Sequence, residues 1–139
     1  MKKSVIVLIV ILAIIALGAA VTAAVNYGMY KANLARIAEY QGVENDYAVT
    51  PVADENGVYT FTTDRELKIM QLADIHIGGG WMSFSKDRMA INAVAAMVSA
   101  EKPDLVVLTG DQVYPVPFQS GTFNNKISTN LIIALMEQL

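Results

Sequence analysis

Residues 5–25 form the longest apolar run of the chain, consist mostly of Ile, Val, Leu and Ala, and contain no charged residue. A helix over these 21 residues spans roughly 30 Å at about 1.5 Å per residue, which matches the hydrocarbon core of a bilayer. Lys2 and Lys3 precede the run, and cations at this end favour a cytoplasmic location of the N-terminus. The pattern therefore predicts one transmembrane helix, with the following residues exported.

Three interpretations of this run differ in the fate of the helix. Small residues at Ala20, Thr22, Ala23 and Ala24 resemble the cleavage site of a secretory signal peptide. The apolar part of a signal peptide usually has only about 7–15 residues, so the length favours an uncleaved anchor. We expect residues 1–26 to be a cytoplasmic basic tip and signal anchor of a single-pass cell-membrane protein. A cleaved signal, which would yield a secreted protein, and a buried core helix are the alternatives.

The next segment, residues 27–46, is more polar and is rich in helix-forming residues such as Leu34 and Ala35, with Gly42 as a plausible stop. We expect it to be a helical stalk or linker between the membrane and a domain at residues 47–139.

The hydrophobic pattern of that domain begins with two β-type stretches. Residues 58–63 are β-branched and aromatic, and the stretch 67–73 is apolar after Lys68 apart from Gln71. The polar stretch between them suits a turn. An apolar run of this kind predicts a strand buried on both faces.

A helical period follows the second stretch. Ile91, Val94, Ala95 and Val98 recur at i, i+3, i+4 and i+7, and this stripe predicts a helix that Ser85 caps and that ends before Pro103. The sequence "LVVLT" then predicts another strand. Strand, helix and strand within about 45 residues indicate an α/β fold built on a βαβ unit, with parallel strands.

Three side chains that bind metals in proteins follow the ends of these two strands. Asp74 and His76 follow the first strand, Asp111 follows the second, and His76 is the only histidine of the chain. Parallel strands place their carboxyl ends together, and residues two apart in an extended segment point the same way. Two carboxylates and one imidazole suit Zn, Mn or Fe. Either motif alone is also compatible with an ordinary turn, and their pairing in one βαβ unit favours the metal.

The residues after His76 and the charge balance of the chain give no sign of a second kind of binding site. Gly78, Gly79 and Gly80 match neither G-x-G-x-x-G nor a phosphate-binding loop, so we expect a flexible turn. Trp81 and Phe84 are expected to be packing or rim residues, with stacking on a substrate as the alternative. Beyond residue 26 the chain has 8 Lys and Arg against 13 Asp and Glu, which gives no sign of a nucleic-acid partner.

The stretches "LKIMQLADIHIGG" and "EKPDLVVLTGDQV" together resemble the start of the calcineurin-like metallophosphoesterases. The signature of that family opens with D-x-H, here Asp74-Ile75-His76, and continues with G-D, here Gly110-Asp111. The tetrapeptide "TGDQ" is similar to the corresponding stretch of the purple-acid-phosphatase-related single-domain branch. The resemblance covers residues 57–139 and implies the N-terminal βαβ portion of a β-sandwich flanked by helices.

By this resemblance, Asp74 and His76 bind a first metal ion and Asp111 bridges two divalent ions, Mn, Fe or Zn, which act on a phosphate-ester substrate. The family also needs G-N-H-[DE], a further His and G-H-x-H, and none of these is present. We therefore expect an extracytoplasmic phosphoesterase represented by an incomplete N-terminal fragment that is inactive alone. The alternative is a non-catalytic, membrane-anchored binding or scaffold domain that retains only half of a metal site.

Overall fold

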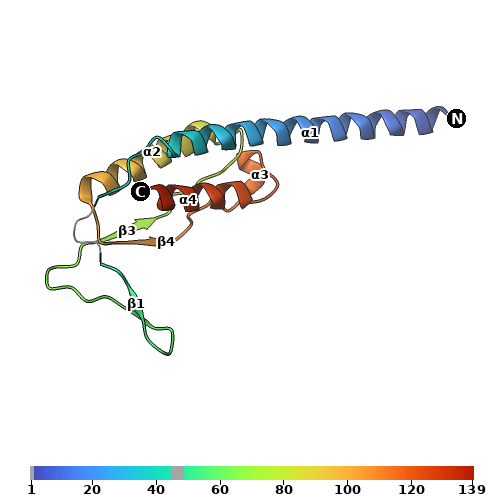
Figure 1. Ribbon diagram of the computed structural model, residues 1–139. Helices are drawn as coiled ribbons and strands as arrows, with labels where there is room; N and C mark the ends of the chain where they lie inside the picture. Colours follow the sequence, from blue (N-terminus) through green and yellow to red (C-terminus); the bar gives the residue numbers. More distant parts are fainter. Residues whose placement is uncertain (1, 45–48) are drawn as a thin grey trace.

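A computed structural model describes residues 2–44 and 49–139 of the chain (Figure 1). Its elements, in chain order, are α1 (Lys3–Ile37), β1 (Val52–Ala53), β2 (Tyr59–Thr60), β3 (Ile69–Ala73), α2 (Phe84–Glu101), β4 (Leu105–Thr109), α3 (Pro117–Ser120) and α4 (Lys126–Gln138). The chain is thus of mixed α/β class, as the hydrophobic pattern predicts.

Helix α1 is continuous over 35 residues, and its N-terminal part projects away from all other elements (Figure 1). Within the described residues it is the one helix that is long and apolar enough to cross a membrane. Its apolar part is not buried by the rest of the chain, which argues against the core-helix interpretation. A long, exposed apolar helix is consistent with a membrane anchor or a signal sequence.

The second half of α1 packs on the domain, whereas the sequence suggested a separate stalk at residues 27–46. Ile37 is only 2% exposed and belongs to the hydrophobic core, against which Tyr30 and Leu34 also pack. Beyond the helix, the Val43 N–H donates to the Leu139 carbonyl over 2.7 Å. The difference arises because the apolar residues of this segment lie on one face of the helix and are few. The sequence of the segment therefore cannot be distinguished from that of a polar linker.

Polar contacts fix the C-terminal end of α1 and the residues just after it. The Arg36 Nε donates to Asn92 Oδ1 over 2.7 Å, and the Tyr40 hydroxyl donates to the same oxygen. The amide of Gln138 on α4 donates to the Tyr40 carbonyl over 2.7 Å. Helix α1 is therefore one continuous element. Its N-terminal part is the projecting apolar segment, and its C-terminal part belongs to the domain.

The predicted βαβ unit is present. Strands β3 and β4 are parallel and pair in register from Ile69 with Leu105 to Ala73 with Thr109, and α2 connects them. Helix α2 begins two residues earlier than predicted, because Ser83 and not Ser85 occupies its N-cap. It ends at Glu101 as expected, since Lys102 adopts a left-handed conformation before Pro103.

The core lies between the helices and one face of the β3–β4 pair. The predicted stripe on α2 is fully buried, and it packs with residues from α1, α4 and the strand region: Ile37, Leu72, Ile77, Leu131, Ile132 and Leu135. Burying these aliphatic side chains supplies the main favourable free energy of the fold.

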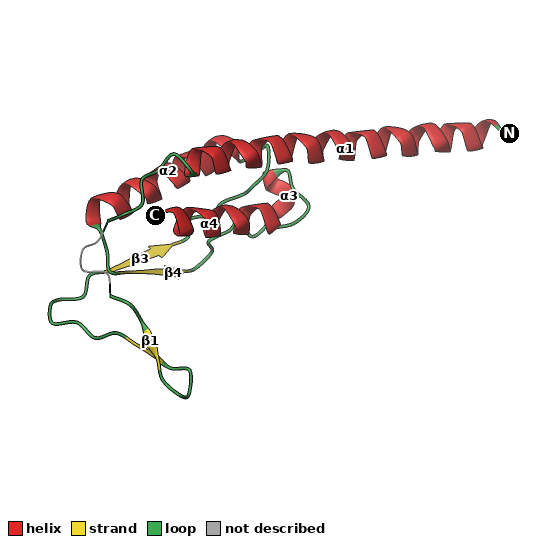
Figure 2. Ribbon diagram, in the orientation of Figure 1, coloured by secondary structure: helices red, strands yellow, loops and turns green. Residues whose placement is uncertain are grey.

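The prediction that the second strand is buried on both faces is wrong for the structure described. Leu72 is the only buried residue of β3, and Ile69 is more than half exposed. The helices all lie on one side of the β3–β4 pair, so no layer formed by residues 2–44 and 49–139 covers its other face (Figure 2). An apolar run thus indicates the potential for two-sided burial without showing which faces are covered.

The predicted strand at residues 58–63 is reduced to β2. It pairs antiparallel with β1, which the sequence analysis did not predict, and forms a hairpin separate from the β3–β4 sheet. Both strands of the hairpin are exposed. The hairpin projects from the end of the domain that lies away from the bare part of α1 (Figure 1).

Replacing Ile37 tests whether this half of α1 is part of the folded domain. Ile37→Ala should lower the free energy of unfolding by about 2–4 kcal/mol, because it opens a cavity in the core. Denaturant unfolding of the full chain in detergent micelles, followed by Trp81 fluorescence, measures this change. Ile14→Ala, at an exposed position on the projecting part of the same helix, is the control. Equal effects of the two substitutions would contradict the packing of α1 on the domain.

Candidate functional site

The pairing of β3 with β4 continues past the ends of both strands. The Asp74 N–H donates to the Thr109 carbonyl over 3.3 Å, and the His76 N–H donates to the Asp111 carbonyl over 3.1 Å. Ile77 then forms a parallel bridge with Val113. The two segments that carry the predicted ligands are therefore held side by side by backbone hydrogen bonds.

Asp74, His76 and Asp111, which we call the strand-end cluster, converge in space. The Nε2 atom of His76 lies 3.8 Å from Oδ1 of Asp74 and 3.9 Å from Oδ2 of Asp111. The Asp111 N–H donates to Oδ1 of Asp74 over 3.1 Å and orients that carboxylate. All three side chains are exposed, so solvent and solutes have access to them.

The backbone that produces this convergence is not extended, contrary to the prediction. Asp74 and His76 both have a φ of 56°, in the left-handed region that non-glycine residues rarely adopt. Such conformations cost about 1–3 kcal/mol each and occur often at functional sites. The residues two apart still face one another, but they do so through a sharp local turn and not through the alternation of a strand.

Glycine is required beside the cluster at position 110. Its φ is 67°, and a Cβ atom there would lie 2.7 Å from Oδ1 of Asp74. Any side chain would therefore displace the Asp74 carboxylate. The G-D pair identified in the sequence thus has a geometric basis, because the glycine makes room for the carboxylate across the strand pair.

The donor set of the strand-end cluster suits a divalent transition metal. Ligand atoms bound to one ion at about 2.1 Å lie roughly 3–3.5 Å apart, slightly closer than the distances around His76. Within residues 2–44 and 49–139, no three His, Asp or Glu side chains already form a closed metal-binding group. Small side-chain rotations would bring these exposed groups to ligand distance, and further ligands would complete the coordination.

The three glycines after the cluster form a buried, closely packed turn, whereas the sequence suggested a flexible one. A Cβ atom on Gly80 would lie 1.9 Å from the Ser120 carbonyl oxygen, and one on Gly78 would lie 2.4 Å from Ser83 Oγ. Gly79 has a positive φ of 71°. The glycines are needed because neighbouring backbone and side chains approach too closely for any other residue.

Asp87 holds this glycine turn and was missed by the sequence analysis. Its carboxylate is buried in the first turn of α2 and accepts the N–H groups of Gly78 and Gly79, each over 2.8 Å. The Ser83 hydroxyl donates to the same carboxylate over 2.9 Å. The sequence did contain a signal for Asp87: it is an acidic residue in the first turn of a helix, and that helix follows three glycines.

Burial raises the pKa of Asp87 above its usual 3.8, and the hydrogen bonds from Gly78, Gly79 and Ser83 oppose this shift. Loss of solvation for the ionised form is the largest cause. Asp87 is therefore a structural carboxylate that positions the turn next to His76.

A cavity of about 270 Å³ connects the cluster to the glycine turn and α3. His76 lines it together with Tyr114, whose ring lies edge-on to the imidazole at 5.9 Å between centroids. The Tyr114 hydroxyl donates to Gln119 Oε1 over 2.7 Å. Tyr114 belongs to no motif in the sequence and was not predicted to lie at the site.

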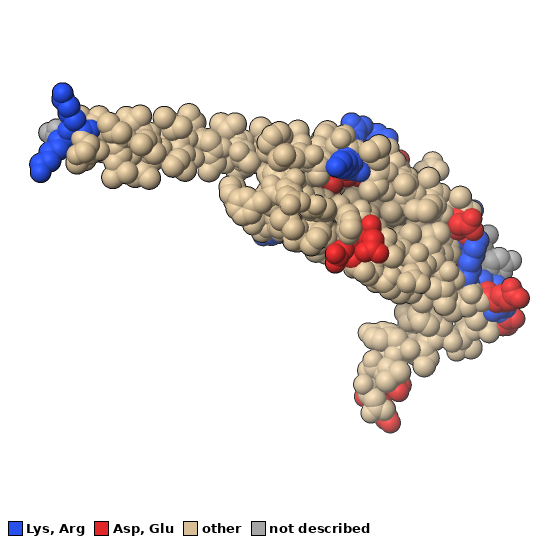
Figure 3. Space-filling view, turned by 180° about the vertical axis from the view of Figure 1, so that it is seen from behind, with Lys and Arg blue, Asp and Glu red and all other residues tan. Residues whose placement is uncertain are grey.

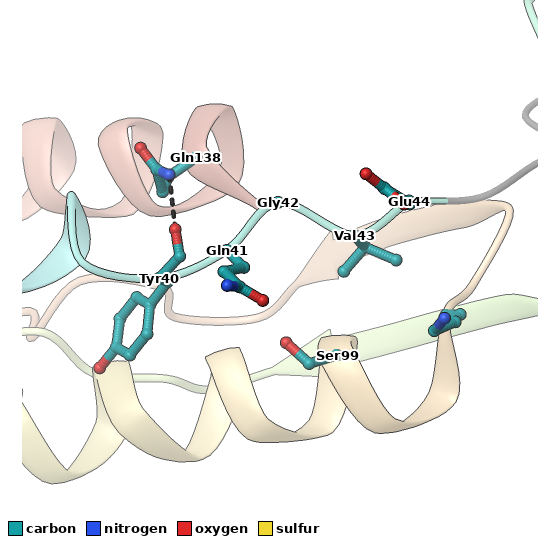
Figure 4. A pocket seen from close by; sticks show the side chains of 8 residues that line it. Tyr40, Gln41, Gly42, Val43, Glu44, Ser99 and Gln138 are labelled. Atoms are coloured by element: carbon teal, nitrogen blue, oxygen red, sulfur yellow. Dashed lines mark hydrogen bonds between the residues drawn. The ribbon is translucent and has the colours of Figure 1, made fainter.

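A larger cavity, of about 660 Å³, lies elsewhere, between the segment after α1 and the C-terminal ends of α2 and α4 (Figure 4). Two of its lining residues are joined by the hydrogen bond from Gln138 to the Tyr40 carbonyl. No residue of the strand-end cluster lines this cavity.

The expected packing or rim residues differ in exposure. Trp81 is half exposed, and Phe84 is half-buried with the Arg88 guanidinium 5.7 Å from its ring centroid. Both lie outside the strand-end cluster.

No match for this chain is found among protein-family models, curated proteins or solved structures.

Asp87→Ala should lower the free energy of unfolding by about 2–4 kcal/mol, because it leaves buried N–H donors of the glycine turn without an acceptor. Chemical denaturation in micelles measures the loss. Met89→Ala, at an exposed position of the same helix, should change stability by less than about 0.5 kcal/mol. A loss no larger than that of the control would show that the turn does not depend on Asp87.

The pH dependence of the free energy of unfolding gives a second test of Asp87. Because the pKa of Asp87 is raised on folding, the folded chain binds this proton more tightly than the unfolded chain does. The proton-linked part of the contribution of Asp87 to stability is thus complete below its unfolded pKa and is lost as pH rises through the folded pKa, whereas acceptance of the Gly78 and Gly79 N–H groups persists. Asp87→Asn should remove this part of the pH dependence, and an unchanged pH profile would contradict the assignment.

Proposed function

We propose that the chain is part of a membrane-anchored, extracytoplasmic phosphoesterase that depends on divalent metal ions. The supporting observation is the convergence of two carboxylates and one imidazole at the carboxyl ends of two parallel strands. Ligands bind at this edge of open α/β sheets. The resemblance to calcineurin-like metallophosphoesterases in the D-x-H and G-D motifs agrees with this placement.

Each member of the cluster has a distinct role in the proposal. Asp74 and His76 would hold a first ion, and Asp111 would serve as a ligand shared with a second ion. When bound, Mn, Fe or Zn ions supply the positive charge that polarises a phosphate ester and activates water. The Asp111 N–H keeps the Asp74 carboxylate in position, and the exposure of the cluster admits the substrate.

The proposed pair of ions needs more imidazole ligands than this chain supplies, because His76 is its single histidine. Those ligands must come from outside these 139 residues, and the 139 residues alone are expected to be inactive. The single histidine also favours the second candidate, a non-catalytic membrane-anchored domain that keeps half of a metal site.

The membrane part of the proposal rests on α1. Its exposed apolar segment is the anchor, and Lys2 and Lys3 favour a cytoplasmic N-terminus. In this orientation the strand-end cluster lies outside the cytoplasm. Cleavage of the segment by signal peptidase would instead release the domain.

Asp111→Asn tests the function. The complete product of the gene that encodes these residues, which would carry the remaining ligands, should hydrolyse an aryl phosphate when it is purified from membranes and supplied with Mn²⁺. The substitution removes the bridging charge, so activity should fall by about 100-fold or more, with the fold retained in circular dichroism. Asp54→Asn, in the exposed hairpin region, is the matched control and should keep full activity.

Two results would contradict the phosphoesterase proposal. One is the absence of hydrolysis with Mn²⁺, Zn²⁺ or Fe²⁺, which would favour the non-catalytic candidate. The other is full activity of the Asp111→Asn variant, which would remove Asp111 from the site.

A further inference from the structure

Asn26 joins the end of the apolar run to two loops of the domain. Its side chain is buried, its Nδ2 donates to the Gly121 carbonyl over 2.8 Å, and its Oδ1 accepts the Trp81 N–H over 2.9 Å. Asn26 directly follows the uncharged residues 5–25. The turn before α2 and the end of α3 are therefore fixed at the level of α1 where the apolar segment stops.

The indole of Trp81 lies against the backbone at Gly121. A Cβ atom on Gly121 would lie 2.6 Å from the indole Nε1, so only glycine leaves room for the ring. This close approach holds Trp81 beside α3. In Figure 1, α3 lies at the end of the domain nearest the projecting part of α1.

Large apolar side chains are exposed on these two loops. We call Trp81, Met82, Phe118 and Phe123 the interfacial surface; they are 50%, 55%, 71% and 64% exposed. The rings of Phe118 and Phe123 pack edge to face with 5.5 Å between centroids, so they form one cluster. Contiguous exposed apolar groups of this kind mark a site of interaction with another apolar phase or partner.

The loops that carry the interfacial surface have no charged residue. Neither residues 77–85 nor residues 112–125 contain Asp, Glu, Lys or Arg. In the space-filling view, the part of the domain next to the bare helix is largely free of charged atoms, which gather mostly farther along the domain (Figure 3). A protein partner held by ion pairs does not fit this surface, whereas a lipid phase does.

The position of the interfacial surface along α1 indicates that its partner is the lipid bilayer. With residues 5–25 in the hydrocarbon core, Asn26 lies at the boundary between the acyl chains and the headgroups. Tyr27 is exposed at that level, and the Lys31 ammonium lies 5.8 Å from its ring centroid. Trp and Tyr are enriched at this depth, and Lys reaches outward from it to the headgroups.

We propose that the interfacial surface inserts into the headgroup region of the phospholipid bilayer that α1 crosses. The domain is then held against the membrane at two places, by α1 and by the loops around α3. The inference rests on the anchor part of the proposed function and is independent of phosphoesterase activity.

Trp81 reports directly on this contact because it is the only tryptophan of the chain. The full chain would be reconstituted into vesicles of phosphatidylcholine and phosphatidylglycerol, with phosphatidylcholine brominated either near the headgroup or near the end of the acyl chain. Trp81 fluorescence should be quenched about twofold or more by the shallow bromines and less by the deep ones. Its emission should also lie to the blue of that of a tryptophan in water.

A matched control moves the tryptophan to the other end of the domain. The double variant Trp81→Phe with Phe61→Trp places the reporter after β2, beside the projecting hairpin, where bromines should not quench it (Figure 1). In the double variant Phe118→Ser with Phe123→Ser, quenching of Trp81 by the shallow bromines should fall, because the apolar loops no longer bring lipid around the indole, although Asn26 on α1 still fixes the backbone of Trp81.

Vesicle flotation separates the possible failures. If the chain floats with the vesicles and Trp81 is no more quenched than the tryptophan at position 61, the interfacial contact is refuted and the anchor stands. If the chain does not float, the anchor and the contact are both refuted. Neither result bears on the hydrolysis assay with Asp111→Asn.

Discussion

The backbone pairing of β3 with β4 beyond Ala73 and Thr109 is the constraint on which the candidate site depends. Two strands that separated at their ends would leave Asp74 and Asp111 on unconnected loops. Here the hydrogen bonds from Asp74 and His76 to the opposite segment, followed by the bridge at Ile77, keep the loops together. The left-handed conformations of Asp74 and His76 are the cost of this turn, and the close packing around it supports them.

The surroundings of the turn explain how that cost is sustained. Asp87 binds the two glycine N–H groups from the first turn of α2, so the helix and the turn are fixed to each other. Helix α2 in turn packs its buried stripe against α1 and α4. Because α1 continues from the core into the exposed apolar segment, the position of the domain along the proposed membrane normal is set by the same packing.

The elements with strong local signals could be predicted from the sequence. The stripe at Ile91, Val94, Ala95 and Val98 is buried, and the two strands around α2 are parallel. The meeting of Asp74, His76 and Asp111 followed from the rule that parallel strands end at the same edge. Their roles as metal ligands stay a prediction, as does the family resemblance on which the two-metal arrangement is based.

The remaining features depend on distant contacts that no local pattern records. Asn26 falls at the end of the predicted anchor and Asn33 in the predicted linker, yet both are buried where α1 meets the domain. The apolar run of β3 does not reveal that only one face is covered. Gly78 and Gly80 resemble a flexible turn until the positions of Ser83 and Ser120 are known, because those neighbours exclude any Cβ atom.

The central claim is that the strand-end cluster binds a divalent metal ion, and the single histidine permits a direct measurement. In the full chain labelled with ¹³C-histidine in micelles, His76 gives the only imidazole signal in the NMR spectrum. We predict that Mn²⁺ broadens this signal at substoichiometric concentrations, because a bound paramagnetic ion would contact the ring. The double variant Asp74→Asn with Asp111→Asn should abolish the effect. A His76 signal that stays sharp in excess Mn²⁺ would contradict the account.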